Sequence, residues 1–129
     1  MKTEELRERL MGVMDETTAL LSAPLIPTKV SESLVPAVEE WWRKANATVD
    51  SIMRMYYLAK NKLDRVEEIP DLTSDIEIRE IVDLIEDMEV KVKQLKQSRE
   101  EILKLIEKDM EYRVKLNFNE PSLFRTVRE

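Results

Sequence analysis

The carboxylates near the middle of the chain are the side chains whose type and spacing could do chemistry. Glu80, Asp83, Glu86 and Asp87 recur at helical spacing, and oxygen ligands of this kind can bind a divalent cation such as Mg²⁺. The chain has no histidine and no cysteine, which excludes Ser-His-Asp and Cys-His catalysis and the usual zinc and haem ligands. Its one glycine, Gly12, excludes the glycine-rich loops that bind phosphates. Because acidic residues at this spacing most often form a solvated helix face, we expect no catalytic, metal-binding or cofactor-binding residue.

Two short acidic motifs suggest an alternative function. Glu39 and Glu40 are followed by the tryptophan pair and then directly by Arg43, and Glu80 and Asp83 form an E-x-x-D motif. The arrangement resembles that of all-α nucleotide pyrophosphohydrolases of the MazG type, in which E-E-x-x-E on one helix and E-x-x-D on the next hold magnesium. Arg43 stands where that family has its third glutamate, so the first motif is incomplete. The resemblance implies a metal-dependent nucleotide pyrophosphohydrolase as the alternative function, with these carboxylates as metal ligands.

Charge and hydropathy exclude other classes of function. The formal net charge is -6, with both signs interspersed, so we expect no nucleic acid partner. The chain has no apolar run long enough to span a membrane. Its first residues are charged where a signal peptide needs an apolar core. We therefore expect an intracellular protein, cytoplasmic or nuclear.

Apolar residues recur with a helical period along most of the chain, which predicts an all-α fold. Charged residues make up 37% of the chain, as suits long helices with a narrow apolar stripe and a wide solvated face. We expect helices at about residues 3–22, 33–67 and 74–116 within a single domain over residues 1–116, followed by a non-helical tail over residues 117–129. Pro24, Pro27 and Pro70 fall between the helices, because proline interrupts a helix interior.

The two longer helices carry a stripe whose spacing alternates between four and three residues. The stripe contains Val38, Trp42, Ala45, Val49, Ile52, Tyr56, Ala59, Leu63 and Val66 in the first, and Ile78, Ile81, Ile85, Met88, Val92, Leu95, Arg99, Ile102 and Ile106 in the second. The N-terminal helix has a shorter stripe of Leu6, Leu10, Val13, Thr17 and Leu20. This alternation is the period of a coiled coil. It indicates that the long helices pack against each other along their stripes.

The link between the long helices predicts a long antiparallel hairpin. The link is short and contains Pro70, and short links join antiparallel neighbours. Both helices are acidic early and basic late, which suits their dipoles and brings the basic end of one beside the acidic start of the other. The register that follows places Trp42 near Arg99, where a guanidinium can stack on the indole. With the N-terminal helix, the hairpin forms either a three-helix bundle or part of an oligomeric helical bundle.

Two sets of apolar residues are predicted to bind partners. Trp41 points roughly 100° away from Trp42 around the helix, and Met55 and Tyr57 also lie beside or outside the stripe. Phe118, Leu123 and Phe124 form the second set, in the expected tail. The first set must be covered by the N-terminal helix or by another chain. The second set either packs back on the bundle or docks into a partner as a short linear motif.

The predicted function follows from these surfaces. We expect a non-enzymatic structural subunit or adaptor that acts through coiled-coil protein–protein interaction within a larger assembly. Its partner would be another helical protein or a second copy of itself.

Overall fold

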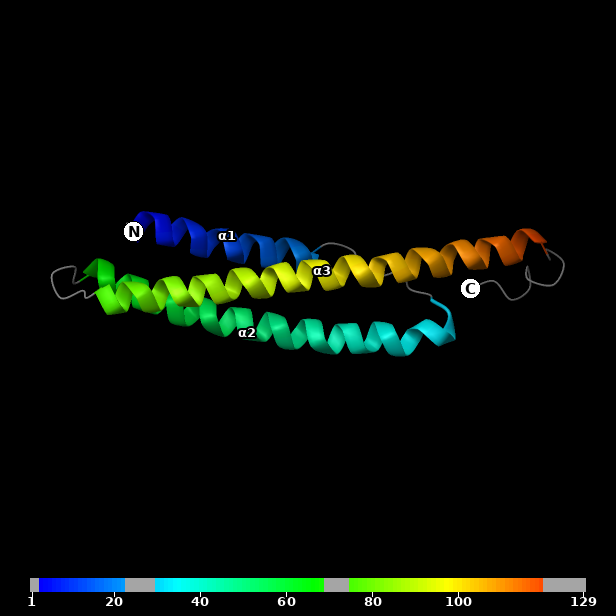
Figure 1. Ribbon diagram of the computed structural model, residues 1–129, viewed down its shortest axis with the longest axis horizontal. Coiled ribbons are helices and arrows are strands. Elements are labelled where there is room, and N and C mark those ends of the chain that lie inside the picture. Colours follow the sequence, from blue (N-terminus) through cyan, green and yellow to red (C-terminus); the bar gives the residue numbers. More distant parts are fainter. Residues whose placement is uncertain (1–2, 23–29, 69–74, 120–129) are drawn as a thin grey trace. The chain divides into compact units, whose positions relative to one another are not determined.

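A computed structural model of the protein describes residues 3–22, 30–68 and 75–119, with side chains as far as Tyr112. Within these ranges the chain contains three α-helices and one short 3-10 helix, and no strand. The elements are α1 (Thr3–Ser22), η1 (Glu32–Leu34), α2 (Val35–Glu68) and α3 (Asp75–Asn119) (Figure 1). The predicted all-α fold is confirmed, and each helix bound lies within three residues of its predicted position.

Local sequence explains where the helices begin. Glu4 and Glu5 occupy the first turn of α1, and Asp75 and Glu77 that of α3, where negative charge suits the helix dipole. The helix α2 begins with Pro36 in its first turn, where no intrahelical amide bond is lost. The preceding 3-10 turn is closed by the Leu34 amide, which donates to the Ser31 carbonyl at 2.9 Å.

The end of α3 differs from the prediction. The helix continues to Asn119, so residues 117–119 of the expected tail are helical in their backbone. The remainder of the tail, residues 120–129, lies outside the described residues.

The chain forms two compact units. Unit 1 consists of Met1–Ala23 and Ala45–Lys96, and unit 2 of Pro24–Lys44 and Gln97–Glu129. Unit 1 therefore contains α1 with the later part of α2 and the earlier part of α3. Unit 2 contains the earlier part of α2 and the later part of α3. The single domain expected over residues 1–116 stays a prediction.

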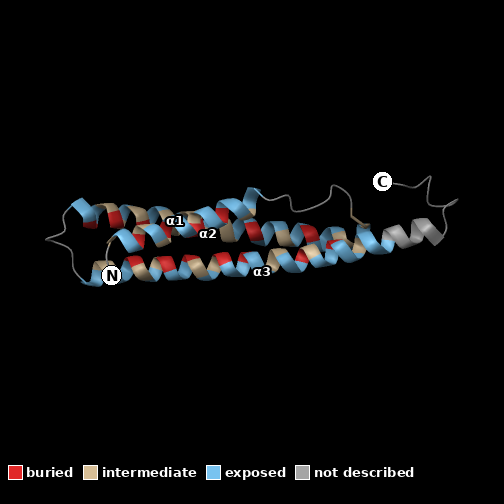
Figure 2. Cartoon of the chain, turned by 90° about the horizontal axis from the view of Figure 1, so that it is seen from above, coloured by how far each residue is buried: buried red, intermediate tan, exposed pale blue. Residues whose placement is uncertain are grey.

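In unit 1, three helical segments share one core. Their buried faces, red in Figure 2, carry Leu6, Leu10, Val13, Ile52, Ala59, Leu63, Val66, Ile81, Ile85, Met88 and Val92. The predicted stripe of α1 is confirmed, since Leu6, Leu10, Val13 and Thr17 are its buried residues. The Thr17 hydroxyl donates to the Val13 carbonyl at 2.8 Å, which satisfies the one polar side chain buried here.

In unit 2, two helical segments share a much smaller core. Only Val38, Ile102 and Ile106 are buried in this cluster, with Val30, Leu34 and Trp41 packed partly buried against them. The Ser31 amide donates to Asp109 Oδ2 at 3.1 Å, and Trp41 Nε1 donates to Ser98 Oγ at 3.2 Å. Residue numbers therefore rise along one segment as they fall along the other. The antiparallel hairpin over the full length of α2 and α3 stays a prediction.

The prediction that Trp42 belongs to the core-facing stripe is wrong. Trp42 is 40% exposed, whereas Trp41 packs against the core of unit 2. From Leu34 the next inward-facing residue is Val38, four residues later, and Trp41 follows after three more. Ala45 comes four residues after Trp41. Val49 continues the stripe after a further four residues, so two spacings of four stand together. Such an insertion shifts the phase of a heptad stripe, and a strict alternation carried back from Ala45 selects the wrong tryptophan.

Candidate partner-binding surfaces

One carboxylate of each acidic motif is engaged in an ion pair. Lys62 Nζ lies 3.0 Å from Glu80 Oε2, and Arg43 Nε donates to Glu40 Oε2 at 3.1 Å. The hydrogen bond from Arg43 lowers the pKa of Glu40 below its ordinary value. Among the described residues, no group of three or more acidic side chains is gathered as a metal site would require.

A hollow in unit 1 offers no clear preference for a charged ligand. It has a volume of about 360 Å³ and is lined by Lys62, Arg65, Ile76, Glu77 and Glu80. Two cations face two anions, and the Lys62–Glu80 pair joins them across the lining. Opposite charges so placed neutralise each other, so the lining selects neither an anion nor a cation.

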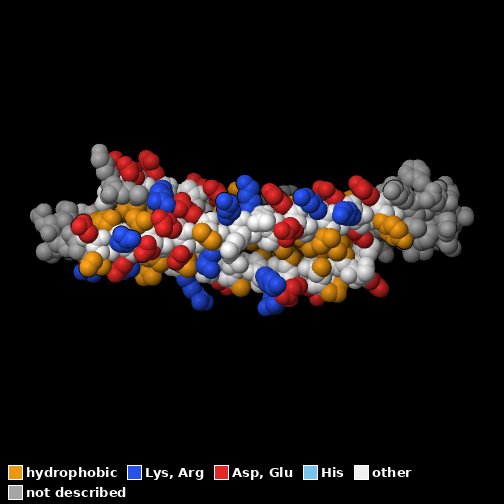
Figure 3. All heavy atoms as spheres, viewed as in Figure 1, with side chains coloured by type: hydrophobic (Ala, Val, Ile, Leu, Met, Phe, Trp, Pro, Cys, Tyr) orange, Lys and Arg blue, Asp and Glu red, His pale blue; other side chains and the backbone are white. Residues whose placement is uncertain are grey.

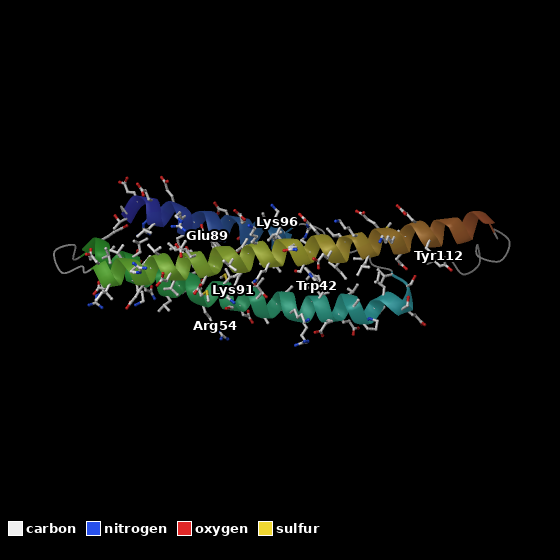
Figure 4. All side chains as sticks on the ribbon, viewed as in Figure 1. Trp42, Arg54, Glu89, Lys91, Lys96 and Tyr112 are labelled. Atoms are coloured by element: carbon white, nitrogen blue, oxygen red, sulfur yellow. The ribbon has the colours of Figure 1, made fainter. Side chains whose placement is uncertain are left out.

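Ion pairs flank the apolar stripe with which α1 packs in unit 1. Arg7 lies 2.9 Å from Asp64 Oδ1 and 3.0 Å from Glu67 Oε2, both on α2. Arg9 pairs with Glu89 on α3 at 2.5 Å, and Figure 4 shows Glu89 on the side of α3 that carries α1. Hydrogen bonds from Arg7 and then Lys60 lower the pKa of Asp64. Unit 1 thus shows how this chain binds a third helix: apolar residues fill the core and arginines meet carboxylates at its edges.

The residues predicted to bind partners occupy three kinds of environment. Trp41 and Met55 are half-buried against the cores of unit 2 and unit 1. Tyr57 is 56% exposed, with its ring edge-on to that of Tyr56 at a centroid distance of 5.4 Å. Phe118 belongs to α3, but its side chain, like Leu123 and Phe124, lies outside the described residues.

Several exposed apolar side chains of unit 2 are not among the residues predicted to bind partners. These are Val35, Trp42, Leu105, Met110 and Tyr112. Figure 3 shows hydrophobic side chains gathered over α2 and α3 among charges of both signs, and Figure 4 locates Trp42 and Tyr112 on those helices. The alternating spacing predicts that Trp42 faces the core, so the sequence pattern does not reveal the outer face of α2. The described helices include none with an apolar stretch that could cross a membrane.

Comparison with known proteins identified no relative. No protein-family model, no curated protein and no solved structure matches this chain.

Proposed function

We propose that this protein is a non-enzymatic structural subunit or adaptor that binds another helical protein, or a second copy of itself, through coiled-coil contacts within a larger assembly. The observation that carries the proposal is the contrast within unit 2 between a small core and several large exposed apolar side chains. Val38, Ile102 and Ile106 are its buried cluster, while Trp42 and Tyr112 are among the residues left exposed.

The energetics favour a partner for unit 2. In unit 1 a third helix, α1, covers the other two segments and joins their core. In its described part, unit 2 contains only two α-helical segments besides the short helix η1. Covering the exposed parts of several large apolar side chains removes apolar surface from water, which favours the binding of a partner helix.

The proposal includes the antiparallel course of α2 and α3 as a hairpin. Three contacts support it: Lys62 with Glu80, Trp41 with Ser98 and Ser31 with Asp109. From Lys62 through Trp41 to Ser31 the residue numbers fall, while the numbers of their partners on α3 rise from Glu80 through Ser98 to Asp109. A hairpin of this kind presents the same flanks to a partner along each segment, as coiled-coil assembly requires.

The proposal also assigns the protein to the cell interior and excludes nucleic acid as its partner. The net charge of -6 with interspersed signs supports the second point.

Multi-angle light scattering of the purified full chain tests the proposal. We expect either a mass above that of the monomer or a monomer that binds an amphipathic helical peptide in a titration. A monomer that binds no helical peptide would contradict the proposal. Magnesium-dependent release of pyrophosphate from nucleotides, abolished by Glu80→Ala, would instead establish the hydrolase alternative.

A further inference from the structure

One side of unit 2 carries a continuous set of apolar residues that we call the flank face: Val35 and Trp42 on α2, Leu103 and Met110 on α3. Val35, Trp42 and Met110 are exposed, and Leu103 is half-buried. On α2, Val35 directly follows Leu34 and Trp42 directly follows Trp41, and Leu34 and Trp41 both pack against the core. Residues seven apart lie on the same side of a helix, so each helix presents its two residues together.

The two helices present these residues on the same side of the unit. Leu103 directly follows the buried Ile102, as Trp42 follows Trp41. The contacts of Ser31 with Asp109 and Trp41 with Ser98 show that the segments run in opposite directions. Two packed antiparallel helices are related by a rotation of 180° about an axis perpendicular to the plane that contains both helix axes. That rotation keeps the residues that follow core residues on one side of the pair.

Glutamates border the flank face on both helices. Each stands three residues before one of the four apolar residues, where helical neighbours touch: Glu32 before Val35, Glu39 before Trp42, Glu100 before Leu103 and Glu107 before Met110. All four glutamates are exposed. In the part of the chain that the structure describes, none of the four has an ion pair.

A nearby carboxylate on another side of unit 2 does form ion pairs. Glu40, one residue after Glu39, pairs with Arg43 and Lys44. Arg43 and Lys44 therefore meet Glu40, and the border of the flank face on α2 keeps its negative charge. On α3, Lys104 lies four residues after Glu100 and three before Glu107, so that border keeps a net negative charge with one cation beside two glutamates.

Unit 1 provides the chemical precedent. There α1 packs an apolar stripe onto α2 and α3 while Arg7 and Arg9 bind carboxylates beside that stripe. Glu89, which binds Arg9, directly follows the buried Met88. In the same way, Leu103 directly follows the buried Ile102. In unit 1, the third helix thus packs on the side of α3 formed by the residues that come one position after its core residues.

We infer that the flank face binds an amphipathic helix of a different protein, one whose apolar stripe is bordered on both sides by arginine or lysine. The inference rests on the proposed function and specifies the chemistry of the partner. Charge complementarity selects this occupant over a second copy. Two flank faces placed together would oppose four glutamates with four more, and like charges across an interface disfavour association.

Calorimetric titration of the full chain with two synthetic peptides tests the inference. Both peptides have 20 residues, the length of α1, and the same leucine stripe; one has arginine at its flanking positions and the other glutamate. We expect the arginine peptide to bind and the glutamate peptide to bind at least about tenfold more weakly. Trp42→Ala should weaken binding of the arginine peptide by about tenfold or more.

Matched variants separate the flank face from general charge. The double variant Glu100→Gln with Glu107→Gln should weaken binding of the arginine peptide by about fivefold. Glu101→Gln, at an exposed neighbouring position off the flank face, should leave it unchanged. Equal loss in Glu101→Gln would overturn the inference, as would absence of binding.

Three results would overturn the inference while leaving the proposed function in place. The first is equal affinity for the two peptides, because a partner helix would then bind without regard to charge. The second is a homodimer that Trp42→Ala dissociates, because a second copy would then occupy the face. The third is a large gain in peptide affinity on removing residues 120–129, because the chain's own terminus would then be the occupant.

Discussion

The indole Nε1 of Trp41 donates a hydrogen bond to the Ser98 hydroxyl at 3.2 Å, and so links the two helical segments of unit 2. Trp41→Ala removes this bond together with contacts to the core cluster. We expect it to lower the free energy of unfolding by about 2–4 kcal/mol, near the lower part of the range for a large core residue. Trp42→Ala, at an exposed position, should change it by less than about 0.5 kcal/mol. Urea denaturation of both variants measures the difference. Equal losses would mean that the two rings share the core.

Ile52 is fully buried in unit 1, within its cluster of buried apolar residues. Ile52→Asp should therefore abolish the cooperative thermal transition seen by circular dichroism, because an unpaired buried charge costs several kcal/mol. Ile76→Asp is the matched control, since Ile76 is 70% exposed on α3. We expect its melting temperature to equal that of the parent protein. An unchanged transition in Ile52→Asp would show that Ile52 is not in the core.

The attachment of α1 should depend on pH through Asp64. The folded pKa of Asp64 is lowered by hydrogen bonds from Arg7 and Lys60, so its stabilising contribution is present above its ordinary pKa of 3.8 and is lost as the pH falls through the lowered folded value. Asp64→Asn should increase amide hydrogen exchange in α1 near neutral pH. This difference between variant and parent should disappear in strong acid.

The exposed Asp83 on α3 supplies the control for that measurement. Asp83→Asn should leave exchange in α1 unchanged at every pH. If Asp64→Asn also has no effect near neutral pH, the Arg7 pairs contribute nothing to the attachment of α1, and its apolar stripe alone holds it.

Removal of residues 120–129 should leave the three helices intact and weaken association with a partner. The apolar side chains of Leu123 and Phe124 motivate this expectation, since they stand beyond the end of α3 at Asn119. Circular dichroism checks the helices, and light scattering or peptide titration checks association. A large drop in melting temperature would assign these residues to the core instead.

The sequence by itself determined the helices and most of their core-facing residues. Proline positions and acidic first turns set the helix bounds, because these effects act within one turn of the backbone. The stripe of α1 and that of α2 from Ala45 to Val66 were predictable because burial repeats with the helical period. The net charge and the absence of histidine and cysteine were likewise properties of composition alone.

Only the tertiary structure decided which tryptophan faces the core and which carboxylates are paired. The spacing before Ala45 permits either Trp41 or Trp42, and the contact with Ser98 on α3 selects Trp41. Arg7 and Asp64 are separated by 57 residues, and no local pattern indicates that they meet. Rotation of a helix and long-range ion pairs depend on where a second helix lies. That position is a property of the packed chain, so the flank face could be recognised only after the core of unit 2 had fixed the phase of α2.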